Sequence, residues 1–148
     1  MLATKNTVTK LLPQGSPMIM VDTLISHDDQ QTVTAFTINK ENIFVVNGRF
    51  SEAGLIENMA QSAALRTGWM AMQRSDSTEA FRPPVGVIGA VKGFMLYQLP
   101  DIDTSLETEI IVLTEIFNAT MIKASIKAGK ELLAEGELKI FIQDQSNS

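Results

Sequence analysis

The sequence predicts an α+β fold in which a strongly curved antiparallel sheet wraps one long central helix. Residues 51–73 predict a long helix with apolar side chains on all of its faces, as expected for a helix surrounded by other structure. The second half of the chain holds four long β-rich segments separated by short turns. With 148 residues, the chain fits a single domain, 1–148, whose core we expect to span about 11–142.

The first part of the chain predicts two strands. Prolines and a glycine at 12–17 indicate a turn, and the apolar run Met18–Val21 that follows predicts a buried strand. Residues 31–38 are rich in β-branched side chains that alternate along the chain. This pattern predicts a strand whose two faces are packed differently.

Ser51 and Glu52 predict the start of the long helix. Ser51 can cap the free amides of the first turn, and Glu52 places a negative charge near the positive end of the helix dipole. The helix then continues to about Gln73 through a run rich in Ala, Leu, Met and Ile. Residues 74–84 are polar and contain two adjacent prolines, which indicates a loop.

The rest of the chain predicts an antiparallel meander with hairpin turns at Asn118 and at 128–130. The tail from Gln143 is polar, and we expect it to fray. The four β-rich segments of the meander are 85–96, 107–117, 119–127 and 131–142.

The composition excludes several functions. The chain has no cysteine and one histidine, so it can form neither a thiolate site nor a cysteine and histidine metal cluster, and we expect no metal and no cofactor. The one histidine, His27, falls in a polar stretch and is predicted to be a solvated turn residue. The net charge is −5 and the 12 Lys and Arg are scattered, which argues against a nucleic-acid partner.

The sequence also argues against a membrane location. The N-terminus lacks the pattern of a secretory signal, and the longest apolar stretch, 53–72, is interrupted by polar and charged residues. We therefore expect a cytoplasmic protein with no membrane partner.

Glu57 is the main candidate for chemistry. On a helix, the residues three and four positions away from it include no cation: they are Ala53, Gly54, Ala60 and Gln61. A carboxyl group with little solvent and no paired charge keeps its proton more readily, so Glu57 is predicted to act as a general acid. The alternative is that Glu57 lies at a wet end of the helix or is hydrogen-bonded by a neighbouring loop.

Two neighbours of Glu57 are candidates for substrate contact. Gln61 can hydrogen-bond a substrate carbonyl or orient Glu57, and its alternative role is a polar residue satisfied by backbone groups. Gly54 leaves room for an acyl chain, or only for tight packing of a sheet on the helix.

Two segments resemble the signatures of the FabZ-type β-hydroxyacyl-ACP dehydratases. Residues 12–22 read LPQGSPMIMVD and residues 57–61 read ENMAQ, in the order and with the rough spacing of that family. Residues 86–94 are similar to the family's strand that ends in a basic residue, a small residue and Phe. The resemblance covers about 11–142 and implies a hotdog fold, a curved antiparallel sheet around a long helix, in dimers or trimers of dimers.

The resemblance also implies an active site shared by two subunits. In the family, a histidine after Leu-Pro removes the α-proton of a hydroxyacyl thioester, and the helix glutamate of the other subunit protonates the departing hydroxyl. Glu57 matches the acid, whereas Gln14 occupies the position of the base. The amide of Gln14 cannot accept a proton near neutral pH.

The implied substrate is an acyl thioester of ACP or CoA in fatty-acid or polyene biosynthesis. Lys92 and Arg49 are single basic residues that are candidates for contacting the phosphate of phosphopantetheine. The family's Gly-His-Phe segment and its proline-rich turn are replaced by Gly48-Arg49-Phe50 and then directly by Ser51. We expect this difference to reshape the mouth of the acyl tunnel, where Phe50 is a candidate for substrate contact.

Three functions remain open. The first is a dehydratase-like lyase that is impaired alone and is complemented by a complete subunit, in a heterodimer where Glu57 serves a mixed site. The second is a hotdog acyl thioesterase in which Glu57 and Gln14 position a water molecule. The third is a non-catalytic protein that binds acyl chains or acyl carrier protein.

Overall fold

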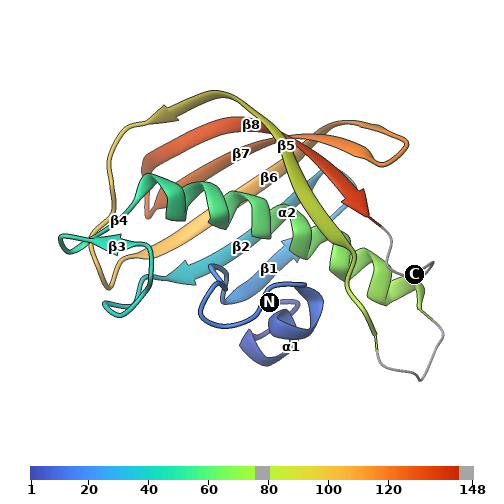
Figure 1. Ribbon diagram of the computed structural model, residues 1–148, viewed down its shortest axis with the longest axis horizontal. Coiled ribbons are helices and arrows are strands. Elements are labelled where there is room, and N and C mark those ends of the chain that lie inside the picture. Colours follow the sequence, from blue (N-terminus) through green and yellow to red (C-terminus); the bar gives the residue numbers. More distant parts are fainter. Residues whose placement is uncertain (76–80, 144–148) are drawn as a thin grey trace.

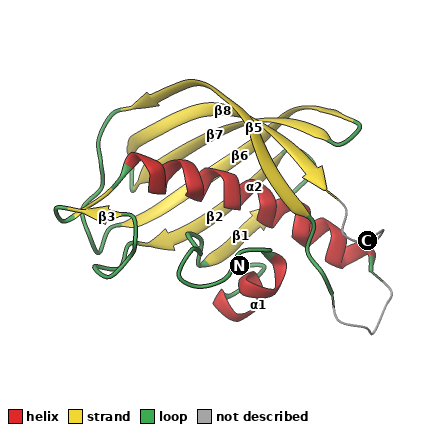
Figure 2. Ribbon diagram, in the orientation of Figure 1, coloured by secondary structure: helices red, strands yellow, loops and turns green. Residues whose placement is uncertain are grey.

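The computed structural model describes residues 1–75 and 81–143, which form a six-stranded antiparallel sheet curved around one long helix (Figure 1, Figure 2). The strand order is β1-β2-β6-β7-β8-β5, and β3 and β4 form a separate two-stranded sheet. The predicted curved sheet around a central helix is therefore confirmed. The elements are α1 (Lys5–Leu11), β1 (Thr23–His27), β2 (Gln31–Thr37), β3 (Val45–Val46), β4 (Arg49–Phe50), α2 (Glu52–Arg74), β5 (Val85–Leu96), β6 (Ser105–Ile116), β7 (Ala119–Ala128) and β8 (Glu131–Gln143).

Helix α2 begins at the predicted cap. Ser51 Oγ accepts a hydrogen bond from the backbone N–H of Gly54 at 3.3 Å, and Glu52 lies in the first turn. Arg74 lies in the last turn, where its positive charge is favourable next to the negative end of the helix dipole. Both predicted ends of the helix are confirmed to within one residue.

The apolar residues of α2 face two layers of the molecule, which explains why they lie all round the helix. Leu55, Met59 and Ala63 pack in the main core against the sheet. Ala64 and Leu65 belong to a second buried cluster, which they share with α1 and β1. Figure 2 shows α2 lying between the curved sheet and α1.

The hairpins of the second half follow the predicted turns. Phe117 and Asn118 connect β6 to β7, and Phe117 adopts a left-handed conformation with φ 55. Gly129, with φ 60, lies in the turn between β7 and β8, where glycine adopts this conformation without a steric cost. Strands β2, β5, β6, β7 and β8 all begin and end within two residues of their predicted bounds.

The strand predicted at Met18–Val21 is wrong. Met20 and Val21 are fully buried, as expected, but β1 begins only at Thr23. The reason is that the backbone of Met20 is hydrogen-bonded by two side chains of α2, those of Asn58 and Gln61. Met20 and Val21 are therefore buried without belonging to a strand.

Several elements had no prediction. Helix α1 spans only seven residues, and the side chain of its N-cap residue, Thr4, makes no capping hydrogen bond. His27 ends β1 and is partly buried, so its prediction as a solvated turn residue is wrong; the turn follows it.

The predicted loop at 74–84 and the predicted frayed tail lie partly outside the described residues. Neither described helix has an apolar stretch long enough to cross a lipid bilayer.

Candidate active site

A segment before β1 runs along α2 in the opposite direction and forms one wall of the site. Its start lies beside Gly68, where a side chain would come within 2.3 Å of the Leu11 carbonyl oxygen. Further along, the carbonyl of Met18 meets Gln61, and the carbonyl of Met20 meets Asn58. The segment that carries Gln14 is thus held along the half of α2 that follows Glu57.

Gln61 is the residue that joins this segment to Glu57. Its Oε1 accepts a hydrogen bond from the backbone N–H of Met20 at 2.7 Å. Its Nε2 donates to the Met18 carbonyl at 2.6 Å and to Glu57 Oε1 at 2.9 Å. Gln61 is 0% exposed, and both of its N–H groups are used in these bonds. It orients the carboxyl of Glu57, and it has no free donor for a substrate carbonyl; its predicted role in substrate binding is not supported.

Among the described residues, the side chain of Glu57 is hydrogen-bonded by an amide and forms no salt bridge with a cation. Within the described part of the chain, the two salt bridges join Arg49 to Asp101 and Arg66 to Glu115. Glu57 is half-buried, and Gln61 holds one of its two oxygens. A carboxyl group fixed in this way, with its second oxygen not engaged by Gln61, is suited to proton transfer to a bound group.

Asn58 is a structural part of the site that the sequence reasoning missed. Its Nδ2 donates to the Met20 carbonyl at 2.7 Å, and its Oδ1 accepts from Thr108 Oγ1 of β6 at 2.6 Å. One turn further along α2, Ser62 and Thr34 of β2 share a hydrogen bond of 2.8 Å. The signal was present, because polar residues on a helix predicted to be buried on every face must find partners inside the protein.

The ring of Phe50 occupies the space beside Gly54, so no channel remains between the two residues. Phe50 is 0% exposed, and a side chain added at Gly54 would come within 2.6 Å of its ring. The ring also packs against Phe36 and Phe44, with centroids 5.7 Å and 6.4 Å away. In the single chain, Phe50 is a core residue, and the predicted substrate contact of these two residues is not supported.

Gln14 and Glu57 are not brought together within one chain. Gln14 Oε1 is buried and has no hydrogen-bond partner among the described residues. No hydrogen bond joins its side chain to Glu57 in that part of the molecule. Gln14 thus holds a buried acceptor on the wall of the site, whereas Glu57 is oriented independently by Gln61.

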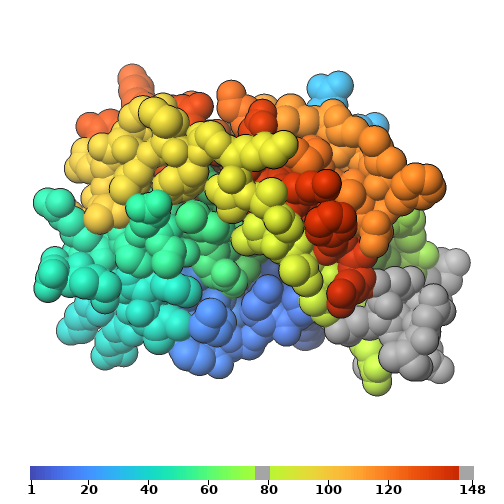
Figure 3. Space-filling model, turned by 45° about the horizontal axis from the view of Figure 1, so that its top comes forward, coloured from blue at the N-terminus to red at the C-terminus, as the bar shows by residue number. Residues whose placement is uncertain are grey.

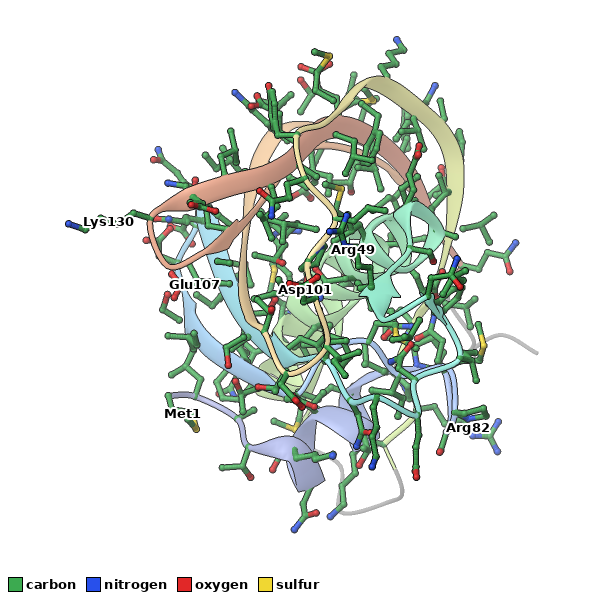
Figure 4. All side chains as sticks on the ribbon, turned by 90° about the vertical axis from the view of Figure 1, so that its left-hand side faces the viewer. Met1, Arg49, Arg82, Asp101, Glu107 and Lys130 are labelled. Atoms are coloured by element: carbon green, nitrogen blue, oxygen red, sulfur yellow. The ribbon has the colours of Figure 1, made fainter. Side chains whose placement is uncertain are left out.

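The two basic candidates lie on other elements. Lys92 is exposed on β5, directly across from Glu137 of β8. Arg49 Nε donates to Asp101 Oδ1 at 3.2 Å, and Figure 4 shows these two side chains meeting at one end of the molecule. Arg49 is therefore already paired, whereas Lys92 is a single exposed cation.

The four hollows described among residues 1–75 and 81–143 are not lined by the predicted site residues. A hollow of about 750 Å³ lies between α1, the segment before β1 and the end of β2, and its walls include Lys5, Ser16 and Asn42. The other hollows described, of about 340, 240 and 180 Å³, are lined by residues of β6, β7 and β8 and by the far half of α2. None of these four hollows is lined by Glu57 or Gln14.

His27 is engaged far along the sheet edge. Its Nδ1 lies 2.8 Å from Thr32 Oγ1, the fully buried hydroxyl on β2. Burial lowers the pKa of His27, the charge of Arg66 lowers it further, and Asp28 and Asp29 oppose this shift. The only histidine of the chain therefore bonds Thr32 and does not face Glu57 within the single chain.

The sheet wrapped around α2 is a hotdog fold, and the chain is of the FabZ-like class of hotdog dehydratases. Residues 6–148 match the ApeP-like family, whose description is ApeP dehydratase. The chain belongs to this family, and the recognised resemblance is confirmed.

Comparison with individual proteins agrees with this assignment. The 3-hydroxyacyl-[acyl-carrier-protein] dehydratase FabZ of Listeria welshimeri is 26% identical over 140 residues, which cover 93% of this chain and 94% of the relative. The dehydratase heterocomplex ApeI:P from Xenorhabdus doucetiae contains a chain with a TM-score of 0.82 and 18% identity, covering 94% of this chain and 92% of that one. A hypothetical thioesterase with coenzyme A from Streptococcus pneumoniae has a TM-score of 0.63 and 10% identity, covering 83% of this chain and 86% of that one.

Proposed function

We propose that the chain is one subunit of a heteromeric dehydratase that removes water from 3-hydroxyacyl thioesters on acyl carrier protein, in fatty-acid or polyene biosynthesis. One observation carries the proposal: Gln61 orients the carboxyl of Glu57 on α2, whereas Gln14 stands where the family has its base. The chain thus supplies the acid of the reaction and not the base.

The reaction needs both groups at once. The base takes the proton from C2 of the substrate, the C3–O bond breaks, a double bond forms between C2 and C3, and the acid gives its proton to the leaving hydroxyl. Glu57 can supply the second proton, but the amide of Gln14 cannot take the first. A partner subunit must therefore bring a histidine to face Glu57.

The exposed edge of the sheet supports such a partner. Strand β5 is the last strand of the sheet and pairs with β8 alone among the described elements, whereas the opposite edge strand, β1, is bridged by Ala3. Val87, Val91 and Met95 of β5 are 48%, 40% and 53% exposed. The yellow atoms of β5 lie uncovered at the surface in Figure 3. A long apolar edge strand of this kind favours pairing with another chain.

Pairing across this edge has a consequence for the number of active sites. If each of two sites takes its base from one subunit and its acid from the other, a mixed pair holds one complete site, formed by Glu57 and the partner's histidine. The second site holds Gln14 in place of the base. We therefore expect one active site for each mixed pair.

Reconstitution tests the role of Glu57. The chain alone, a FabZ-type partner that has the histidine but whose own glutamate is replaced by Gln, and their mixture are assayed with a 3-hydroxyacyl-ACP. Only the mixture should dehydrate the substrate. Replacing Glu57→Gln in this chain should lower the dehydration rate of the mixture by roughly 10²–10⁴-fold. Glu52→Gln, which changes an exposed acid of the same helix, should leave the rate unchanged.

Other outcomes of this assay decide among the alternatives. Glu57-dependent release of thiol from a saturated acyl-CoA would identify a thioesterase, in which Gln14 and Glu57 position water. Neither activity, with binding of acyl-ACP retained in the mixture, would identify a non-catalytic binding protein. Both results would contradict the proposed dehydratase.

Restoring the base tests the role of Gln14 independently. We expect Gln14→His to give the chain alone measurable dehydration, because each of its sites would then hold a histidine and Glu57. The double variant Gln14→His with Glu57→Gln should lose this gain. A Gln14→His chain that folds and forms dimers but stays inactive would show that position 14 does not face the substrate.

A further inference from the structure

A small cavity lies between the second half of α2 and the hairpin that connects β6 to β7. Its volume is about 180 Å³, below the roughly 300 Å³ at which pockets for drug-sized ligands begin. Helix α2 contributes Arg66 and Arg74, and the hairpin contributes Glu115, Asn118 and Thr120. The cavity is about nine residues along α2 from Glu57, so it is separate from the candidate active site.

Arg66 is an unusual residue for the interior of this fold. It is 6% exposed, and its Nη2 donates to Glu115 Oε1 at 2.7 Å. Its Nε is buried and has no acceptor among the described residues. A buried guanidinium donor that is left unpaired costs free energy, so an acceptor that reached this atom would be favoured.

The charges around the cavity are unequal. The two arginines carry two positive charges, whereas Glu115 carries one negative charge and its side chain is 48% exposed. Solvent weakens the field of an exposed carboxylate, so Glu115 does not fully cancel the charge of the buried Arg66.

We propose that this cavity binds a small oxyanion, a carboxylate or phosphate group, through Arg66 and Arg74. Oxygen acceptors of such a group match the fork of N–H donors on a guanidinium. Asn118 and Thr120 also line the cavity, and side chains of these types can donate neutral hydrogen bonds. The small volume admits the anionic group itself and excludes a long acyl chain.

Nuclear magnetic resonance of the ¹⁵N-labelled full chain tests the site directly, because the Nε–H of a buried arginine gives its own signal. Sodium phosphate and sodium benzoate are titrated separately at constant ionic strength, with sodium chloride as the reference. We expect the Arg66 Nε–H signal to shift with saturation at millimolar anion. Saturation with phosphate alone identifies a phosphate site, and saturation with benzoate identifies a carboxylate site.

Matched arginine variants give the control. Arg74 and Arg82 are both exposed, but only Arg74 lines the cavity. Arg74→Gln should weaken the binding about tenfold, since it removes a charged hydrogen-bond donor, and Arg82→Gln should leave it unchanged. A linear shift without saturation, or equal binding by the two variants, would overturn the proposal. The test keeps Arg66 intact, so it does not depend on a variant that might fail to fold.

Discussion

At the scale of single residues, two side-chain amides of α2 form hydrogen bonds to backbone groups, as a neighbouring strand usually does. Asn58 and Gln61 hydrogen-bond the carbonyl and the N–H of Met20, and Gln61 also holds Glu57. The two bonds to Met20 are buried, where an unpaired polar group costs free energy. Both side chains therefore stabilise the fold, and Gln61 also positions the predicted acid.

The substitution Asn58→Ala tests the structural part of this arrangement. It leaves the Met20 carbonyl and the Thr108 hydroxyl without their buried partner, so we expect the free energy of unfolding to fall by about 2–3 kcal/mol. Urea denaturation measures this change. Asn6→Ala, on the exposed face of α1, is the control and should change the stability by less than about 0.5 kcal/mol. Equal stability of the two variants would contradict the role of Asn58.

His27 predicts a pH dependence of stability. Burial first, and then Arg66, lower its pKa in the folded chain below the ordinary value of 6.5, so the unfolded chain binds more protons as the pH falls through that value. The folded state should therefore lose stability as the pH drops below about 6.5. Melting temperatures of the wild-type chain between pH 8 and pH 5 should show this loss.

The variant His27→Gln removes the titration and keeps a polar group that can bond with Thr32. Its melting temperature should fall less than that of the wild-type chain over the same pH range. Parallel curves for the two proteins would show that His27 does not control the loss. Below pH 5, carboxylates also titrate, so the comparison is made above that value.

At the scale of elements, α1 approaches the backbone of α2 closely at Gly68. Gly68 has no side chain, and the Leu11 carbonyl oxygen occupies the space that a Cβ would need. Val8 and Leu11 of α1 are fully buried in the cluster formed with α2 and β1. The position of α1 therefore depends on a glycine in the middle of a long helix, where glycine by itself weakens the helix.

The variant Gly68→Ala shows whether the close contact with Leu11 or the higher helix propensity of alanine has the larger effect on stability. Alanine raises helix propensity, but its Cβ would lie 2.3 Å from backbone oxygen, so we expect a net loss of about 1–2 kcal/mol and displacement of α1. Hydrogen exchange should be faster in α1 than in the wild-type chain. Gly15→Ala is the control, because nothing lies within 4 Å of a Cβ at that position. Unchanged protection of α1 in Gly68→Ala would contradict this account of the contact.

At the scale of the whole molecule, one sheet edge remains open. Strand β5 is 12 residues long and exposes apolar side chains, whereas edge strands of monomeric proteins are usually short, charged or covered. None of the hollows described in the single chain includes Glu57, which agrees with a site completed by a second subunit. The exposed edge strand therefore agrees with the proposed pairing with a second subunit.

A charge on this edge should weaken association. We expect Val91→Lys to raise the dissociation constant of the subunit pair at least tenfold, because pairing would bury the new ammonium group against a second strand. Light scattering after size-exclusion chromatography measures the change in mass. Leu113→Lys, at a residue of β6 that is 47% exposed, is the control. Equal effects of the two substitutions would show that β5 is not the interface.

Much of the fold follows from the sequence because its signals are local. Ser51 with Glu52, the turn at Gly129 and the long β-rich segments each specify their own geometry, and the structure agrees with their predicted positions. The site was only partly predictable. Glu57, Gln61 and Gln14 were recognised from their residue types and the family resemblance, but their contacts depend on segments that are distant in sequence.

The sequence by itself determined the curved sheet, the central helix and the absence of a base at position 14. Only the tertiary structure decided that Met20 is bonded by side chains in place of a strand, that Phe50 fills the space beside Gly54, and that Arg66 is buried next to a cavity. The physical reason is the range of the interactions. Helix caps and turns act over a few residues, whereas buried polar partners and packing contacts are set by side chains that meet only when the sheet closes around the helix.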